Sequence, residues 1–190
     1  MNSLYKNLLK IILLPLMIFI CQSAFAAKWV AEVGMHTGGD EFVNSTNGNS
    51  YSSKAGELMT LAIGPQLTIS DNSNLRVLFA WKFSSMGSMH GSSDNIDFTR
   101  FPIDVMYFYR LKRWNFGGGL SYHINPELSG DGNNINYENA LGYVVEVDFR
   151  FMKSFYVGGK YTDINYKQEN NSTTIDGNSI GVVMGFVFGG

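Results

Sequence analysis

Eight segments of the chain place an apolar residue at every second position. In one of them Met59, Leu61 and Ile63 share one parity, while the residues between them are small or polar. A period of two is the side-chain period of a β-strand whose two faces meet different surroundings. The pattern predicts strands over residues 29–36, 58–69, 75–83, 98–110, 114–124, 140–151, 155–164 and 179–188.

The gaps between these segments alternate between short and long. The short gaps cover residues 70–74, 111–113 and 152–154, whereas the long gaps, rich in Gly, Ser, Asn and Asp, cover 37–57, 84–97, 125–139 and 165–178. In barrels of bacterial outer membranes short turns face the periplasm and long loops face outward. The spacing and the even strand number predict an all-β fold, an eight-stranded antiparallel up-and-down transmembrane β-barrel.

Aromatic residues of outward parity support this orientation, because they separate into the two girdles expected at membrane interfaces. The band near the short turns comprises Trp29, Tyr109, Trp114, Phe149, Phe155 and Phe188, and the band near the long loops comprises Trp81, Phe83, Phe101, Tyr122, Tyr143 and Tyr161. A soluble β-sandwich also alternates, but its one-sided core does not require strands of such uniform length. The mean hydropathy of −0.04 suits a barrel, whose lipid-facing residues alternate with polar lumen residues.

The first 26 residues have the composition of a secretory signal peptide. Lys6 and Lys10 form a basic segment, residues 11–20 an apolar segment, and residues 24–26, Ala-Phe-Ala, a cleavage site. The apolar run is shorter than the ~20 residues of a spanning helix, which argues against a membrane anchor. Cys21 follows Ile20 rather than the small residue of a lipoprotein signal. We therefore divide the chain into a signal peptide, 1–26, and a barrel domain, 27–190.

The mature domain is acidic and contains no cysteine. Without the two lysines of the signal peptide, 12 basic residues stand against 16 acidic ones, a net charge of −4. This balance argues against a nucleic-acid or other polyanion binder. No disulfide framework is available, so stability must come from closure of the barrel and from packing.

Two strand patterns resemble those of small eight-stranded outer-membrane β-barrel proteins of the OmpA and OmpX type. They are residues 100–104, Arg-Phe-Pro-Ile-Asp, and the closing residues 180–188, Ile-Gly-Val-Val-Met-Gly-Phe-Val-Phe. The resemblance covers essentially the whole mature chain. It implies residence in the bacterial outer membrane, contact with its lipids and lipopolysaccharide, and insertion by the barrel-assembly machinery.

The chain departs from this pattern at three points. A final strand ending in an aromatic residue resembles the signal that the assembly machinery recognises, but here two glycines follow Phe188. Pro65 and Pro102 lie inside predicted strands of a sheet without edges. Because proline cannot donate to the ladder, we expect a bulge or a displaced ladder bond at each.

The residues predicted to face the lumen in the half near the short turns include charges of both signs. We predict that these side chains form a buried network, and they are Glu32, Arg76, Asp104, Glu146, Asp148, Arg150 and Lys160. Glu146 and Asp148 also match the type of an acid-base pair, but the neighbouring bases favour salt bridges. An eight-stranded barrel has room for its own side chains or one small ligand, so we expect a plugged lumen rather than an ion pore.

The outer half of the lumen, toward the long loops, has small or apolar residues. One hypothesis is a pocket that binds or passes a small hydrophobic ligand, lined by Leu58, Ala62, Ala80, Val144 and Val183 with His36 and His123 at its rim. The favoured alternative is that Lys82, Arg100 and large loop side chains fill this space.

Three histidines, His36, His90 and His123, are predicted at the outer rim, where enzymes of this architecture that act on lipid A carry catalytic groups. Serines and acids are available there, but the seventh strand lacks the His-x-Ser-Asn segment of a lipid A deacylase. We interpret the three histidines as exposed polar residues and predict no enzymatic activity; the alternative is a lipid A acyl hydrolase or transferase that uses these histidines. No two histidines stand at close ligand spacing, and we predict neither a metal site nor a cofactor.

The predicted loops at the outer end are acidic. With Asp163 at the adjoining end of the seventh predicted strand, they hold eleven acids, Asp40, Glu41, Glu57, Asp94, Asp97, Glu127, Asp131, Glu138, Asp163, Glu169 and Asp176, against the two bases Lys54 and Lys167. One interpretation is a hydrated surface, and the other is that these carboxylates share Ca²⁺ or Mg²⁺ with lipopolysaccharide phosphates. The sequence thus predicts a monomeric barrel with a structural or surface-interaction role through its loops.

Overall fold

The computed structural model describes residues 27–46, 49–55, 58–86, 96–130, 133–169 and 173–189. The predicted signal peptide lies outside these residues, as do His90 and the loop acids Glu57, Asp94 and Asp131. Within the described ranges no helix is long and apolar enough to cross a membrane.

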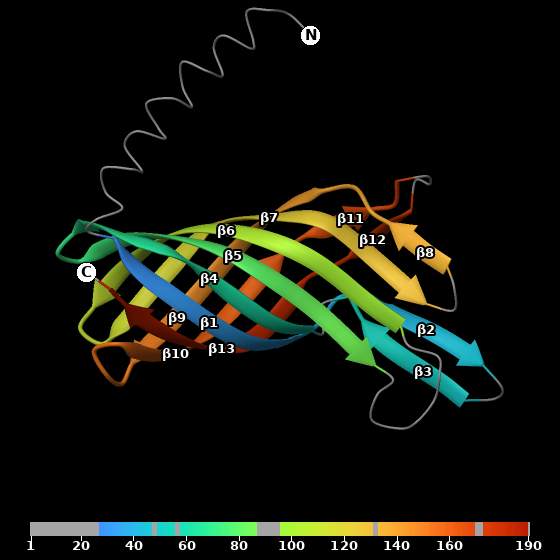
Figure 1. The fold of residues 1–190 in the computed structure, drawn as a ribbon, viewed down its shortest axis with the longest axis horizontal. Helices are drawn as coiled ribbons and strands as arrows, with labels where there is room; N and C mark the ends of the chain where they lie inside the picture. The colour runs from blue at the N-terminus through green and yellow to red at the C-terminus, as the bar shows by residue number, and fades with distance from the viewer. Residues whose placement is uncertain are drawn as a thin grey trace, which may run out of the picture.

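Eight long strands close into a single antiparallel barrel (Figure 1). They are β1 (Lys28–Thr37), β4 (Leu58–Ser70), β5 (Ser73–Met86), β6 (Ile96–Leu111), β7 (Trp114–Gly130), β9 (Ala140–Arg150), β10 (Phe155–Asp163) and β13 (Ser179–Phe188). Their order around the barrel is β6-β5-β4-β1-β13-β10-β9-β7, and the pairing of β6 with β7 closes the ring. Each barrel strand contains or nearly matches one predicted segment, so the predicted fold class is confirmed.

Five short strands extend the barrel at the end where the long loops lie. They are β2 (Glu41–Thr46), β3 (Asn49–Lys54), β8 (Asn133–Asn136), β11 (Asn165–Lys167) and β12 (Thr174–Asp176). β2 pairs with β3 and β11 with β12, whereas β8 pairs with the far end of β7. The sequence analysis predicted loops here, because Asn, Ser and Gly dominate these segments and local hairpins need no apolar face.

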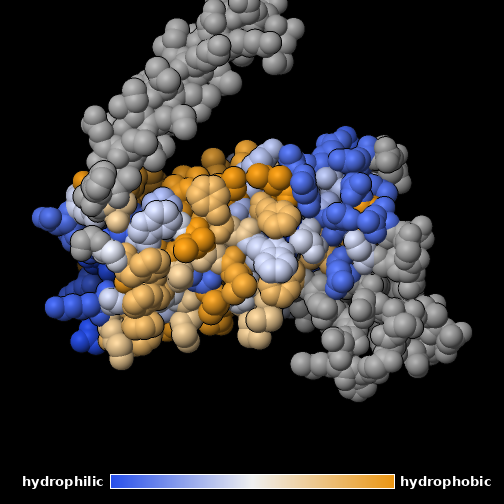
Figure 2. Space-filling model, in the orientation of Figure 1, coloured by the Kyte–Doolittle hydropathy of each residue, from blue (hydrophilic) through white to orange (hydrophobic). Residues whose placement is uncertain are grey.

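The exterior of the barrel is apolar, and its interior holds charged and polar side chains among buried apolar ones. Figure 2 shows an apolar belt around the middle of the molecule with hydrophilic residues at both ends. Every second side chain of the belt is exposed, including Trp29 and Trp114 near the short turns and Trp81 and Tyr143 near the long loops. The alternation in the sequence therefore separates an outer face that meets hydrocarbon from a filled lumen.

Both internal prolines interrupt the β-ladder, as predicted. The pairing of β4 with β5 lapses between Ile63 and Gln66, the interval that contains Pro65. The pairing of β5 with β6 lapses opposite Pro102, and the register of β6 against β7 shifts between Thr99 and Phe101. Neither proline has a ladder partner on β5. This agrees with the absence of an N–H that proline could donate.

Candidate functional site: the barrel lumen and its cap

Arg76 on β5 lies at the centre of a buried ion-pair cluster in the half of the lumen near the short turns. Its Nη1 lies 2.6 Å from Glu146 Oε1 and its Nη2 lies 3.0 Å from Asp148 Oδ2, both on β9. Nη1 also lies 3.7 Å from Glu32 Oε2 on β1. All these side chains are excluded from solvent, so one guanidinium joins strands on opposite sides of the barrel.

Lys160 on β10 is the second cation of the cluster. Its Nζ lies 2.8 Å from Asp104 Oδ2, 3.2 Å from Glu32 Oε1 and 3.4 Å from Glu146 Oε2. The cluster therefore contains two bases and four acids, Arg76, Lys160, Glu32, Asp104, Glu146 and Asp148. The network spans the inner half of the lumen with buried side chains from five strands.

Two aromatic rings lie close to the guanidinium of Arg76. Its Cζ lies 4.0 Å from the centroid of the Phe108 ring and 4.8 Å from that of the Tyr156 ring. Each ring in turn lies over a glycine directly opposite in the ladder, Phe108 over Gly117 and Tyr156 over Gly185. A Cβ at either glycine would overlap the ring, so the missing side chains create the space for this stack. The sequence analysis did not identify these aromatic residues.

Arg150 was predicted as a member of the network, and the structure places it elsewhere. It lies at the short-turn end of β9, and among the described residues no carboxylate is within ion-pair distance of it. Asp148 is two residues deeper in the lumen and pairs with Arg76 instead. The remaining six predicted members do meet.

The residues proposed to line an outer hydrophobic pocket occupy the expected face. Ala62, Ala80, Val144 and Val183 are buried in the lumen, while only the backbone of Leu58 is described, in β4. Lys82 and Arg100, however, are also fully buried in this half. The outer lumen thus holds charged side chains, which disfavours a purely hydrophobic ligand there.

The prediction that His36 and His123 are exposed rim residues is wrong. His36 is 5% exposed and His123 is 0% exposed. His36 lies directly opposite Gly181 in the ladder, and its ring occupies the space above that glycine and above Gly34. The burial depends on which glycines stand opposite the ring, which requires knowledge of the strand register.

A chain of hydrogen bonds leads from Tyr166, at the loop end of the barrel, to Asp104 in the charged cluster. Burial raises the pKa of Tyr166, on β11, to about 12, so its hydroxyl stays protonated and donates to His123 Nδ1. His123 Nε2 lies 2.9 Å from Ser121 Oγ, and Ser121 Oγ donates to Asp104 Oδ1. Since the single hydroxyl proton of Ser121 goes to Asp104, His123 Nε2 must be the donor to Ser121. Histidine in this arrangement cannot accept the serine proton, as a nucleophilic serine would require.

An apolar cluster that the sequence analysis missed covers the outer end of the lumen. Its buried members are Ala55, Phe98, Tyr137, Ala140, Ile164 and Tyr166. The ring of Phe98 meets the rings of Tyr166 and Tyr137 edge-on, with centroids 5.6 and 5.9 Å apart. We call this cluster the aromatic cap. Phe98 and Tyr166 continue the lumen parity of β6 and β10 beyond the membrane belt, and this continuation is the signal from which they could have been found.

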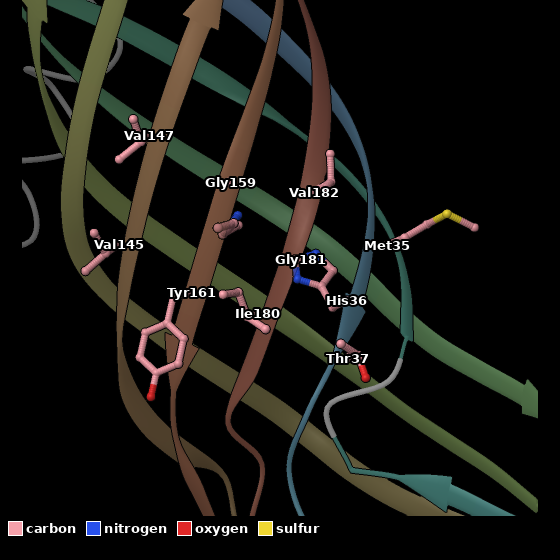
Figure 3. A pocket seen from close by; sticks show the side chains of 11 residues that line it. Met35, His36, Thr37, Val145, Val147, Gly159, Tyr161, Ile180, Gly181 and Val182 are labelled. Carbon is pink, nitrogen blue, oxygen red and sulfur yellow. The ribbon is translucent and has the colours of Figure 1, made fainter.

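One hollow lies on the outside of the barrel wall (Figure 3). It has a volume of about 680 Å³ and lies across β1, β9, β10 and β13, with Gly159 near its centre and Met35, Val145 and Val182 around it. A Cβ at Gly159 would meet no atom within 4 Å. These lining residues face the apolar belt, so the hollow is a depression in the lipid-facing surface and not a pocket of the lumen.

Comparison with known proteins agrees with this architecture. A family model described as outer membrane protein beta-barrel domain matches residues 12–188. The chain belongs to this family. It is accordingly a protein of the bacterial outer membrane. A search by sequence against curated proteins gives no significant match.

Solved barrels of this type share the fold of the chain at low sequence identity. Neisserial surface protein A is 10% identical, with a TM-score of 0.50 and a match over 85% of this chain and 97% of that chain. Ail, the attachment invasion locus protein of Yersinia pestis, in complex with the heparin analogue sucrose octasulfate, is 12% identical, with a TM-score of 0.52 over 85% of this chain and 99% of that chain. These likenesses concern the fold alone.

Proposed function

We propose that the protein is a non-channel, non-enzymatic component of the outer membrane that acts through its acidic loops. The observation that carries this proposal is the filling of the lumen. The ion-pair cluster around Arg76 occupies the half near the short turns, and the aromatic cap covers the other end. A lumen filled in this way would carry no solute, so we propose that the loops are the surface through which the protein interacts.

The loops form a connected crown rather than separate hairpins. The first and last loops join through Asp40, whose backbone N–H donates to the Asp176 carbonyl and whose carboxylate accepts from the Asp176 N–H, both at 2.8 Å. The third and fourth loops join where the Glu138 N–H donates to the Lys167 carbonyl, also at 2.8 Å. A connected crown holds its carboxylates at fixed positions, which favours recognition of a partner.

The crown has the charge expected for divalent cations shared with lipopolysaccharide. Its described acids are Asp40, Glu41, Asp97, Glu127, Glu138, Asp163, Glu169 and Asp176, against Lys54 and Lys167. Glu127 and Glu169 line a hollow of about 240 Å³ together with two asparagines. Among the described residues no three acids or histidines gather as a complete metal site, so phosphate oxygens of the lipid would supply the remaining ligands. Ail was solved with an anionic sugar analogue, a class of ligand that an acidic crown would repel.

Binding of lipopolysaccharide with and without Mg²⁺ tests this role. The refolded mature chain is expected to bind lipopolysaccharide in Mg²⁺ and to lose most of this binding in EDTA. The variant E41Q/D163N/E169Q, which neutralises three exposed crown acids, should bind several-fold more weakly. D71N, which removes an exposed acid at the opposite end, is the matched control and should bind as the wild type does. Binding that is indifferent to EDTA and to the crown variant would refute the proposal.

The hydrogen-bond directions around His123 support the proposed lack of enzymatic activity. His123 donates toward Ser121 and accepts from Tyr166, so neither ring nitrogen is free to act as a base. We expect lipid A from cells producing the protein to have the same mass spectrum as lipid A from cells lacking it. A new lipid A species that disappears in the H123A variant would contradict this expectation.

A further inference from the structure

A row of lumen residues crosses four neighbouring strands in the outer half of the barrel. Gly34 on β1 stands opposite Thr60 on β4, Thr60 opposite Lys82 on β5, and Lys82 opposite Arg100 on β6. All four face the lumen, and the three side chains are at most 2% exposed. We call these residues the outer row.

The outer row brings two buried positive charges side by side, and Asp104, the acid that acts most strongly on Lys82, is itself paired with Lys160. Lys82 and Arg100 are direct cross-strand neighbours, and like charges in this position repel one another. Among the described residues no carboxylate lies within ion-pair distance of either. Burying a charge without a counter-charge is strongly unfavourable, so this arrangement calls for an anion.

The polar atoms around these charges also lack partners. Thr60 Oγ1, Arg100 Nε and Arg100 Nη2 are buried without a hydrogen bond to any described residue, and so are both ring nitrogens of His36. His36 belongs to the same site, because its ring lies beside Gly34. A Cβ placed on Gly34 would be only 2.8 Å from His36 Nε2. Lys82 and Arg100 both act electrostatically on this ring. Donors from four strands therefore converge on one part of the lumen.

The free edge of Arg100 has the shape that an oxyanion accepts. Arg100 Nη1 donates to the Ala55 carbonyl, and the rings of Phe98 and Tyr166 lie 4.8 and 5.3 Å from Cζ. These contacts orient the guanidinium and leave Nε and Nη2, the pair of parallel donors that binds two oxygens of one anion. The register of β6 against β7 shifts at Arg100, which lies opposite two residues of β7, Asn125 and Pro126.

The residues beneath the outer row are small. Ala62 and Ala80, directly opposite one another on β4 and β5, are the next lumen positions toward the charged cluster. These two small side chains separate the outer row from the cluster that begins with Asp104 and Lys160.

We propose that the outer row binds one tetrahedral oxyanion, of the class of inorganic phosphate, inside the barrel. Arg100 holds two of its oxygens side-on, Lys82 supplies the second charge, and Thr60 and His36 donate from the neighbouring strands β4 and β1. The anion completes the electrostatics of the outer lumen beneath the aromatic cap. The site is separate from the acidic crown and does not depend on the function proposed for it.

Calorimetric titration of the refolded mature chain with inorganic phosphate tests this site. The protein is held in a maltoside detergent, which has no phosphate headgroup, and ionic strength is kept constant with NaCl. We expect saturable binding of one phosphate per chain. R100K keeps the charge but loses the paired donors, and K82Q loses the second charge, so each should bind about tenfold or more weakly.

K167Q is the control, because it removes one positive charge from an exposed side chain of the crown. It should bind phosphate as the wild type does. Folding of each variant is checked by far-UV circular dichroism, and R100K suffices if K82Q does not fold. Absence of saturable phosphate binding to the wild-type chain would overturn the proposal. This result is expected if a carboxylate of the chain already occupies the position. Equal weakening in K167Q and R100K would overturn it as well, since it would indicate unspecific attraction.

Discussion

Replacing Arg76 by methionine should destabilise the barrel more than any other single change in the lumen. The substitution keeps much of the side-chain volume between the Phe108 and Tyr156 rings but removes the charge. Lys160 then remains as the one cation facing four buried carboxylates of the cluster. Removing one partner of a buried ion pair leaves an uncompensated charge and costs about 3–5 kcal/mol. We expect a loss of this size in the free energy of unfolding.

The loss is measured by equilibrium unfolding in urea, in detergent micelles, through tryptophan fluorescence. The three tryptophans, Trp29, Trp81 and Trp114, all lie on the lipid-facing surface and leave the apolar environment on unfolding. Combining R76M with E146Q and D148N removes the charges together and should restore much of the stability. K167M breaks the exposed pair of Lys167 with Glu138, 3.1 Å apart, and should cost at most about 1 kcal/mol. An R76M variant within 1 kcal/mol of the wild type would refute this reasoning.

Further predictions concern the glycines, the hydrogen-bonded chain and the cap. G185A places a methyl group in the Tyr156 ring and should cost about 1–3 kcal/mol, whereas G159A, where a Cβ meets no atom within 4 Å, should leave the urea midpoint unchanged. An equal effect of both variants would contradict the aromatic stack. Y166F removes the donor to His123 Nδ1 and leaves a buried acceptor unpaired, so we expect a loss of about 1–3 kcal/mol by the same assay. A stability equal to that of the wild type would show that this hydrogen bond is dispensable.

The sequence predicted the eight barrel strands and their two faces because both follow from a period of two. The same alternation that places Met59 outside and Thr60 inside places Glu32, Arg76 and Lys160 inside the barrel. Their shared location could therefore be predicted without knowing the strand register. The two prolines likewise predicted their ladder interruptions, since the missing N–H has the same effect in any sheet.

Features that depend on register or on loop closure escaped prediction. His36 is buried because Gly181 stands directly opposite it, and the alternation of residues does not reveal which residues are opposite. The aromatic cap joins Phe98, Tyr137 and Tyr166 from three separate segments, and their contact depends on how the loops close. Arg150 has the correct parity for the charged cluster, but its depth in the lumen places it beyond the carboxylates. Parity thus predicts the face of a residue, whereas its height and neighbours need the fold.

Electrical recording from planar bilayers tests the central claim, that the side chains of the barrel close its lumen, most directly. The refolded mature chain is inserted in a symmetric potassium chloride solution, and insertion is verified by recovering folded protein from the membrane. The ion-pair cluster and the aromatic cap predict no discrete conductance steps above the bare bilayer. Stable, ohmic steps from the wild-type chain would show an open water-filled path and would contradict the claim.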